Sequence, residues 1–145
     1  MSDNYSLIIK NGSCYIDGKL EKIDLGLSGK KIKKIGKIEL NSSKVFDATN
    51  KLILPGIIDT QVHFREPGST DAEDLESGSR AAVLGGVTSL FEMPNTNPPT
   101  SNIVEFEKKI QLAKDRMHSN HAFYFGATPD NIEQLSQLKN LKGCC

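Results

Sequence analysis

The sequence of 145 residues contains little cysteine, and its cysteines follow no regular spacing. They are Cys14, Cys144 and Cys145, and an odd, irregular set argues against a disulfide framework. The adjacent pair lacks the CxxC spacing of a zinc site, so we expect no metal there. Such sparse cysteine fits a reducing compartment, and we expect a cytoplasmic protein.

An excess of one charge and a long apolar run are also missing. Eighteen lysines and arginines balance eighteen aspartates and glutamates. This balance gives no electrostatic reason to expect nucleic acid or an anionic membrane as a partner. No stretch approaches the ~18 apolar residues of a membrane span, and residues 1–6 lack the basic-then-apolar layout of a signal peptide.

The chain changes its pattern near residue 55. Residues 5–54 read as short strands separated by turns, with an Asp17-Gly18 hairpin signal and a lysine-rich segment, Lys30 to Ile38, that we expect to be a solvated edge strand. From residue 55 onward, predicted strands alternate with predicted helices. This order predicts parallel strands joined by crossover helices.

Two of these helices carry clear signals. We expect one over about 71–84, begun by a capping box of Thr70 and Glu73 and stopped by Gly85-Gly86. The second has an apolar stripe at helical spacing, formed by Ile103, Phe106, Ile110, Ala113 and Met117.

The segment from Pro55 to Gly68 carries the candidate chemistry. A predicted strand ends near position 62, and His63 and Arg65 follow it. At the C-terminal end of a parallel barrel strand, such side chains point into the mouth of an active site. A neutral histidine ring can ligate a metal, and an arginine fork suits a carboxylate. Taken alone, a single histidine is more often an ordinary packing residue.

Longer motifs make a family resemblance. Asp59 and His63 lie as in the metal-binding signature of the amidohydrolase superfamily, and His63 to Gly68 and Met93 to Pro98 resemble two signatures of dihydroorotase. Residues 77–82 and 85–88 fit the helix and strand between them. The resemblance implies an α/β fold, a partial (β/α)8 TIM-like barrel of about three βα units. It also implies part of a small β-sandwich domain before the barrel, with domains at 1–54 and 55–145.

The resemblance also implies roles for single residues. Dihydroorotases reversibly hydrolyse the cyclic amide of dihydroorotate to carbamoyl aspartate in pyrimidine biosynthesis, using zinc. In that family, the residues matching Arg65 and Asn95 hold the substrate carboxylate. Arg65 favours such a substrate over allantoin or simple hydantoins, because a buried arginine facing a neutral ligand would be an unpaired charge. A turn-forming role between prolines stays an alternative for Asn95.

The sequence departs from the family at the metal site. Gln61 stands where the signature has its first histidine, and an amide oxygen is a poor replacement for imidazole on zinc. His63 is then the one matched metal ligand, no residue here matches the later ligands, and we expect zinc not to be bound stably. We assign no catalytic residue, and we expect structural or neutral roles for His118 and His121.

Three hypotheses follow. The first is a dihydroorotase-like protein without activity as this chain, whose third strand would present an unpaired edge and make it marginally stable. The second is one piece of an active dihydroorotase completed by a separate chain, although Gln61 weighs against it. The third is a non-catalytic interaction module that binds an active amidohydrolase paralogue or a pathway partner. Whether the chain forms a homo-oligomer or binds a paralogue stays open.

Overall fold

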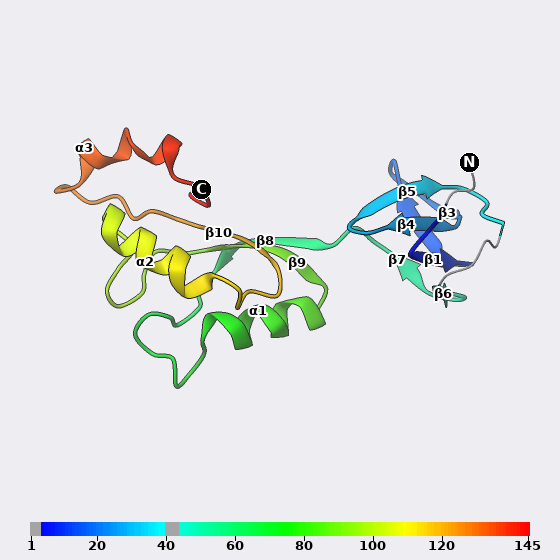
Figure 1. Cartoon of the computed structure of the whole chain (residues 1–145), viewed down its shortest axis with the longest axis horizontal. Coiled ribbons are helices and arrows are strands. Elements are labelled where there is room, and N and C mark those ends of the chain that lie inside the picture. The colour runs from blue at the N-terminus through cyan, green and yellow to red at the C-terminus, as the bar shows by residue number, and fades with distance from the viewer. Residues whose placement is uncertain (1–3, 40–43) are drawn as a thin grey trace. The chain divides into compact units, whose positions relative to one another are not determined.

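The computed structural model of the chain describes residues 4–39 and 44–145. It divides into two compact units, Met1–Pro55 and Gly56–Cys145, which run from blue to cyan and from green to red in Figure 1. No helix in the described ranges is long and apolar enough to cross a membrane.

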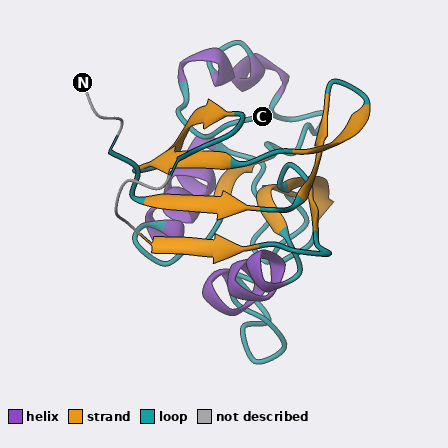
Figure 2. Ribbon diagram, turned by 90° about the vertical axis from the view of Figure 1, so that its right-hand side faces the viewer, coloured by secondary structure: helices purple, strands orange, loops and turns teal. Residues whose placement is uncertain are grey.

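The N-terminal unit consists of two β-sheets. One has the order β5-β4-β1-β6, formed by β5 (Lys31–Ile35), β4 (Leu25–Ser28), β1 (Leu7–Lys10) and β6 (Lys44–Asp47). The other has the order β3-β2-β7, formed by β3 (Lys19–Lys22), β2 (Ser13–Ile16) and β7 (Leu52–Ile53). These strands are drawn in orange in Figure 2. The sheet with β1 buries Tyr5, Ile8 and Ile38 as a small core.

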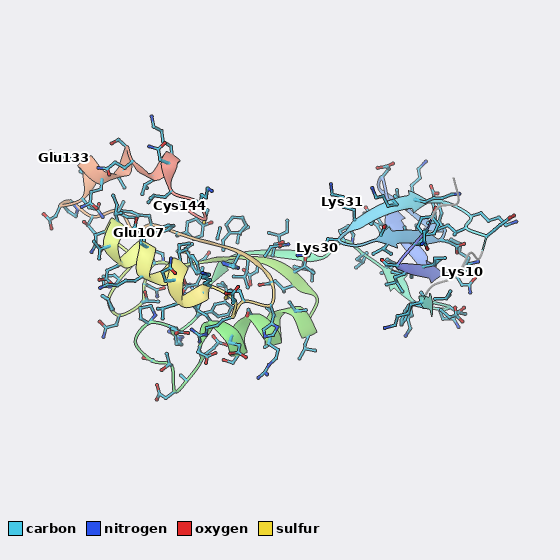
Figure 3. The ribbon with its side chains drawn as sticks, viewed as in Figure 1. Lys10, Lys30, Lys31, Glu107, Glu133 and Cys144 are labelled. Atoms are coloured by element: carbon cyan, nitrogen blue, oxygen red, sulfur yellow. The ribbon has the colours of Figure 1, made fainter. Side chains whose placement is uncertain are left out.

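Two strand predictions for this unit are confirmed. Asp17 and Gly18 have φ values of 48° and 79° and join β2 to β3 as an antiparallel pair, because both residue types tolerate positive φ. The lysine-rich β5 is the outer strand of its sheet, and all its residues are exposed. Figure 3 labels Lys30 and Lys31 at the beginning of this strand.

The C-terminal unit is a parallel sheet with helices. Its strands, in the order β10-β9-β8, are β8 (Ile57–Val62), β9 (Val87–Glu92) and β10 (Asn120–Phe123), and both pairs are parallel as predicted. The helices are α1 (Leu75–Leu84), α2 (Ile103–Ala113) and α3 (Ile132–Leu135), followed by the 3-10 turn η1 (Leu138–Asn140). The green α1 and yellow α2 lie on the same side of the strands in Figure 1. The buried core consists of Phe64, Leu75, Leu90, Phe106, Ala113 and Phe123.

The start of α1 differs from the prediction. Asp74 is the N-cap: its side chain accepts from the Ser77 amide at 2.7 Å, and the Ser77 hydroxyl accepts from the Asp74 amide at 3.2 Å. The predicted box of Thr70 and Glu73 is therefore wrong. The amide of Glu73 donates instead to the carbonyl of Ser69, within a turn that precedes the helix.

The end of α1 agrees with the sequence, whereas α2 is shorter than its stripe. Gly85 caps α1, and Gly86 follows with a φ of 92°, a conformation that favours glycine. The helix α2 ends at Ala113, and Asp115, with a φ of 60°, turns the chain. Met117 still packs against the core, although it lies beyond the helix.

The last residues of the chain lie beside β10. The Phe123 amide donates to the Gly143 carbonyl at 2.8 Å, and the Cys145 amide donates to the Phe123 carbonyl at 3.0 Å. These bonds make a parallel bridge between Phe123 and Cys144. Figure 3 labels Cys144.

Candidate functional site

Two loops meet at the C-terminal ends of β8 and β9. The first runs over 63–74 and the second over 93–102. The Met93 amide donates to the Val62 carbonyl at 2.9 Å, and the Asn97 amide donates to the Pro67 carbonyl at 3.0 Å. Gly68, with a φ of 125°, allows close approach, because a Cβ there would lie 3.0 Å from the Asn97 carbonyl oxygen. The two dihydroorotase-like motifs are therefore packed against each other.

The first loop begins with side chains that alternate between core and surface. His63 and Arg65 are exposed, whereas Phe64 and Glu66 are only 4% and 7% exposed. Such alternation is what extended backbone produces. Phe64 belongs to the core cluster, so the buried side chains anchor the loop, whereas His63 and Arg65 face solvent.

The structure brings two of the predicted site residues together. His63 Nδ1 lies 2.9 Å from Asn95 Oδ1. Because an amide oxygen only accepts, the proton of this bond lies on Nδ1. The Asn95 amide nitrogen and, in a neutral ring, His63 Nε2 are then left for other partners.

Arg65 lies in the same loop as His63, two residues further along the chain. Within residues 4–39 and 44–145, its guanidinium makes no hydrogen bond or ion pair. Its carbonyl accepts from the Ser69 amide at 2.8 Å, which fixes the backbone at this residue. The site therefore has a held backbone and an unpaired cation.

A network of charges lies beneath this loop. Arg116 Nη1 and Nη2 donate to Glu66 Oε1 and Oε2 at 2.8 and 2.9 Å. Glu66 Oε2 also accepts from the Leu75 amide at 2.9 Å, at the N-terminus of α1. The hydrogen bonds that Arg116 donates to Glu66 raise the pKa of Arg116 further above its usual range. At the N-cap, the Ser77 amide lowers the pKa of Asp74.

A second pair of charges is fully buried at the end of β9. Lys109 Nζ donates to Glu92 Oε2 at 2.8 Å, and their side chains are 1% and 0% exposed. Burial raises the pKa of Glu92 to about 7, although Lys109 opposes the rise. Burial likewise lowers the pKa of Lys109, against the effect of Glu92. Among the described residues, Glu92 Oε1 has no hydrogen-bond partner.

Comparison with known proteins decides the family. The model of the Amidohydrolase family matches residues 52–140, more than half of the chain. The chain belongs to the amidohydrolase family. It is 40% identical over 137 residues to the dihydroorotase of Lactobacillus gasseri, and this match covers 91% of this chain and 32% of that relative. It is 36% identical over 136 residues to the allantoinase of Salmonella choleraesuis, and this match covers 93% of this chain and 30% of that relative.

Solved amidohydrolases share the fold. The L-hydantoinase (dihydropyrimidinase) from Arthrobacter aurescens has a TM-score of 0.85 and 26% identity, covering 94% of this chain and 31% of that one. The chain thus spans at most 32% of the length of these relatives. The predictions of a dihydroorotase-like amidohydrolase and of a partial barrel preceded by a β-domain are confirmed.

The residues of the metal-binding signature lie on β8 and directly after it. The described residues contain no group of three histidine, cysteine, aspartate or glutamate side chains that could hold a metal. Gln61 is exposed on β8, and its backbone N–H donates to Asp59 Oδ1 at 2.9 Å. Its amide side chain replaces an imidazole ligand poorly. His63 therefore has no second protein ligand beside it in the part of the chain that the structure describes.

The other two histidines lie away from the two loops. His121 is exposed in β10, and its Nδ1 lies 3.2 Å from the Ser119 carbonyl. The backbone amide of His118 donates to the Ser79 hydroxyl at 3.1 Å. Neither contact involves a residue of the two motifs.

Sequence reasoning missed both charge networks of this amidohydrolase fragment. Lys109 lies three residues after Phe106 and four before Ala113, so it occupies the buried stripe of α2. A lysine at such a position signals a buried partner, although the stripe alone does not identify Glu92. Arg116 and Glu66 are 50 residues apart, and we found no local pattern that links them.

Proposed function

We propose that this chain carries the carboxylate-holding part of a dihydroorotase-like site and does not hold zinc or catalyse by itself. The observation that supports this is the 2.9 Å bond between His63 and Asn95. Arg65 follows His63 by two residues in the same loop, is exposed, and has no ion-pair partner among the described residues. Dihydroorotate and carbamoyl aspartate, the substrate pair of the resemblance, both present a carboxylate.

The chemistry of Arg65 supports a carboxylate as the ligand. A guanidinium donates through a planar fork that matches two carboxylate oxygens. Hydrogen bonds to charged groups contribute about 1.5–3 kcal/mol when shielded, and less when exposed. The exposed Arg65 is therefore expected to favour a carboxylate ligand over a neutral one by about tenfold.

The metal argument rests on the number of ligands. Catalytic zinc in proteins has three protein ligands and an open position, and of the two histidines of the signature this chain retains only His63. The Nδ1 atom of that histidine is already bonded to Asn95. The described residues of this chain therefore provide too few ligands for metal-dependent hydrolysis by the chain alone.

Ligand binding tests the carboxylate proposal. Isothermal titration of the purified chain with dihydroorotate is expected to show binding that Arg65→Gln weakens about tenfold. The matched control is Arg80→Gln, an exposed arginine on α1, which is expected to leave the affinity unchanged. Equal affinities of the chain and of Arg65→Gln, or stronger binding of neutral allantoin than of dihydroorotate, would contradict the proposal.

Metal analysis tests the second half. The purified chain, loaded with zinc and then desalted, is expected to retain much less than one zinc per molecule. Gln61→His restores the two-histidine spacing and is expected to retain more. Near-stoichiometric zinc in the unmodified chain would show that its own residues form a site after all.

The strand order favours a second candidate, an active enzyme formed with further polypeptide. Among the described residues, β8 pairs with β9 alone, and it exposes Ile57 and Ile58 by 55% and 60%. Co-expression with the later barrel strands of a dihydroorotase tests this candidate. Dihydroorotate hydrolysis by the purified mixture, absent from either part alone, would favour it over the inactive chain.

A further inference from the structure

We propose that Arg116 is a positioning residue for the loop over 63–74, here called the substrate-holding loop. Arg116 fixes Glu66 and thereby the backbone that presents Arg65. This inference rests on the proposed carboxylate site. It concerns a residue 50 positions away from the motif, beyond the end of α2.

The geometry of Arg116 leaves it little freedom. Its two terminal nitrogens donate to the two oxygens of Glu66 at 2.8 and 2.9 Å, and Nη1 also donates to the Leu112 carbonyl at 3.0 Å. Nη2 lies 3.7 Å from Asp74 Oδ2. A bidentate pair of this kind fixes the orientation of both planar groups. The end of α2 therefore holds one fixed carboxylate in the substrate-holding loop.

The Glu66 carboxylate also contacts a second element, α1. Its Oε2 accepts from the amide of Leu75, the first residue of α1, at 2.9 Å. Amides in the first turn of a helix have no partner within the helix, and they favour a negative charge. Glu66 thus lies between the N-terminus of α1 and the guanidinium of Arg116, and only 7% of it is exposed.

Removing Arg116 would leave Glu66 as a buried anion with one helix amide as its remaining partner. A buried charge that loses its partner is costly, so it moves to water or takes up a proton. Either change loosens the residue next to Arg65. Phe64 and Glu66 are the two buried side chains on either side of Arg65. Without a fixed Glu66, only Phe64 would hold this stretch from the core, and the backbone that presents Arg65 would be less restrained.

Hydrogen exchange at two amides tests this positioning. The Leu75 amide reports the bond to Glu66, and the Ser69 amide reports the bond to the Arg65 carbonyl. In Arg116→Gln both amides are expected to exchange at least about tenfold faster, because each loses a hydrogen-bonded position. The amide of Phe106, which donates to the carbonyl of the N-cap Asn102 at the start of α2, is expected to change far less.

Two further variants keep the test decisive. Arg116→Lys retains the charge without the fork, so its exchange rates are expected to lie between those of the parent and Arg116→Gln. Arg80→Gln removes an exposed arginine of α1 and is expected to change nothing. If Leu75 and Ser69 accelerate no more than Phe106 does, Arg116 acts on stability alone and the inference is overturned.

Ligand binding separates this inference from the proposed function. At a temperature where both proteins are folded, Arg116→Gln is expected to weaken dihydroorotate binding about fivefold to tenfold, with partial recovery in Arg116→Lys. No binding to the parent chain would refute the proposed function, while the exchange data would still decide whether Arg116 holds the loop. Binding that is unchanged in Arg116→Gln would overturn the positioning role.

Discussion

The buried pair of Glu92 and Lys109 makes a sharp prediction about stability. The Nζ–Oε2 distance is 2.8 Å, and water reaches neither side chain. Lys109→Met keeps the aliphatic length but leaves the Glu92 carboxylate buried without its cation. Breaking such a pair costs about 3–5 kcal/mol, because the remaining charge is unpaired in a medium of low polarity. We expect the free energy of unfolding to fall by this amount.

The neighbouring lysine is the matched control. Lys108 also has a carboxylate partner, with Nζ 2.7 Å from Glu105 Oε1, but its side chain is 62% exposed. An exposed pair of this type contributes about 0.5 kcal/mol or less. Lys108→Met is therefore expected to change stability far less than Lys109→Met, although both variants remove one positive charge from α2.

A double variant separates the unpaired charge from lost packing. Glu92→Leu with Lys109→Met removes both charges, and replacing a buried ion pair by apolar residues is often neutral or stabilising. The methionine would lie near the Phe123 ring, whose centroid is 5.7 Å from Lys109 Nζ, and sulfur–aromatic contacts are favourable. We expect the double variant to recover most of the loss.

Urea unfolding followed by far-UV circular dichroism measures these differences, since the chain has no tryptophan. The reasoning fails if Lys109→Met costs no more than Lys108→Met. It also fails if the double variant is less stable than Lys109→Met, because unpaired charge would then not be the cause. Should Lys109→Met not fold at all, recovery of folding in the double variant still tests the same point.

Three further predictions concern pH, capping and packing. Glu92 has a folded-state pKa of about 7 against an ordinary 4.5, so between these pH values the folded chain binds more protons than the unfolded chain. As the pH falls from 8 to 5, the unfolding free energy of the parent chain should therefore rise relative to that of Glu92→Gln, by at most about 3 kcal/mol. In thermal melts Asp74→Ala should cost about 1 kcal/mol through its lost cap, whereas Thr70→Ala should cost almost nothing. Gly78→Ala should destabilise the chain in urea despite better helix propensity, because its Cβ would lie 2.4 Å from Phe64 Cε1.

Local features of the sequence were sufficient for several elements. The Asp17-Gly18 turn, the edge strand β5 and the end of α1 at Gly85-Gly86 depend on residue types that are adjacent in the chain. The parallel order of β8, β9 and β10 follows from alternating strand and helix patterns. The motif resemblance identified His63 and Asn95, and the structure brings their side chains within hydrogen-bond distance.

Helix boundaries and buried charges depended on the tertiary structure. Thr70 and Glu73 have the spacing of a capping box, yet Asp74 caps α1 because the chain before it turns at Ser69. Both positions fit the local rule, and the surrounding packing selects one of them.

The sequence by itself determined the family and the parallel order of the strands. The motif residues are adjacent in the chain, and the strand and helix patterns alternate along it. Only the tertiary structure decided which charges meet. Glu66 finds Arg116 and Glu92 finds Lys109 across 50 and 17 residues, and either carboxylate could have faced solvent. Burial makes these pairs obligatory, because a charge removed from water needs a partner, and burial is a property of the packed unit alone.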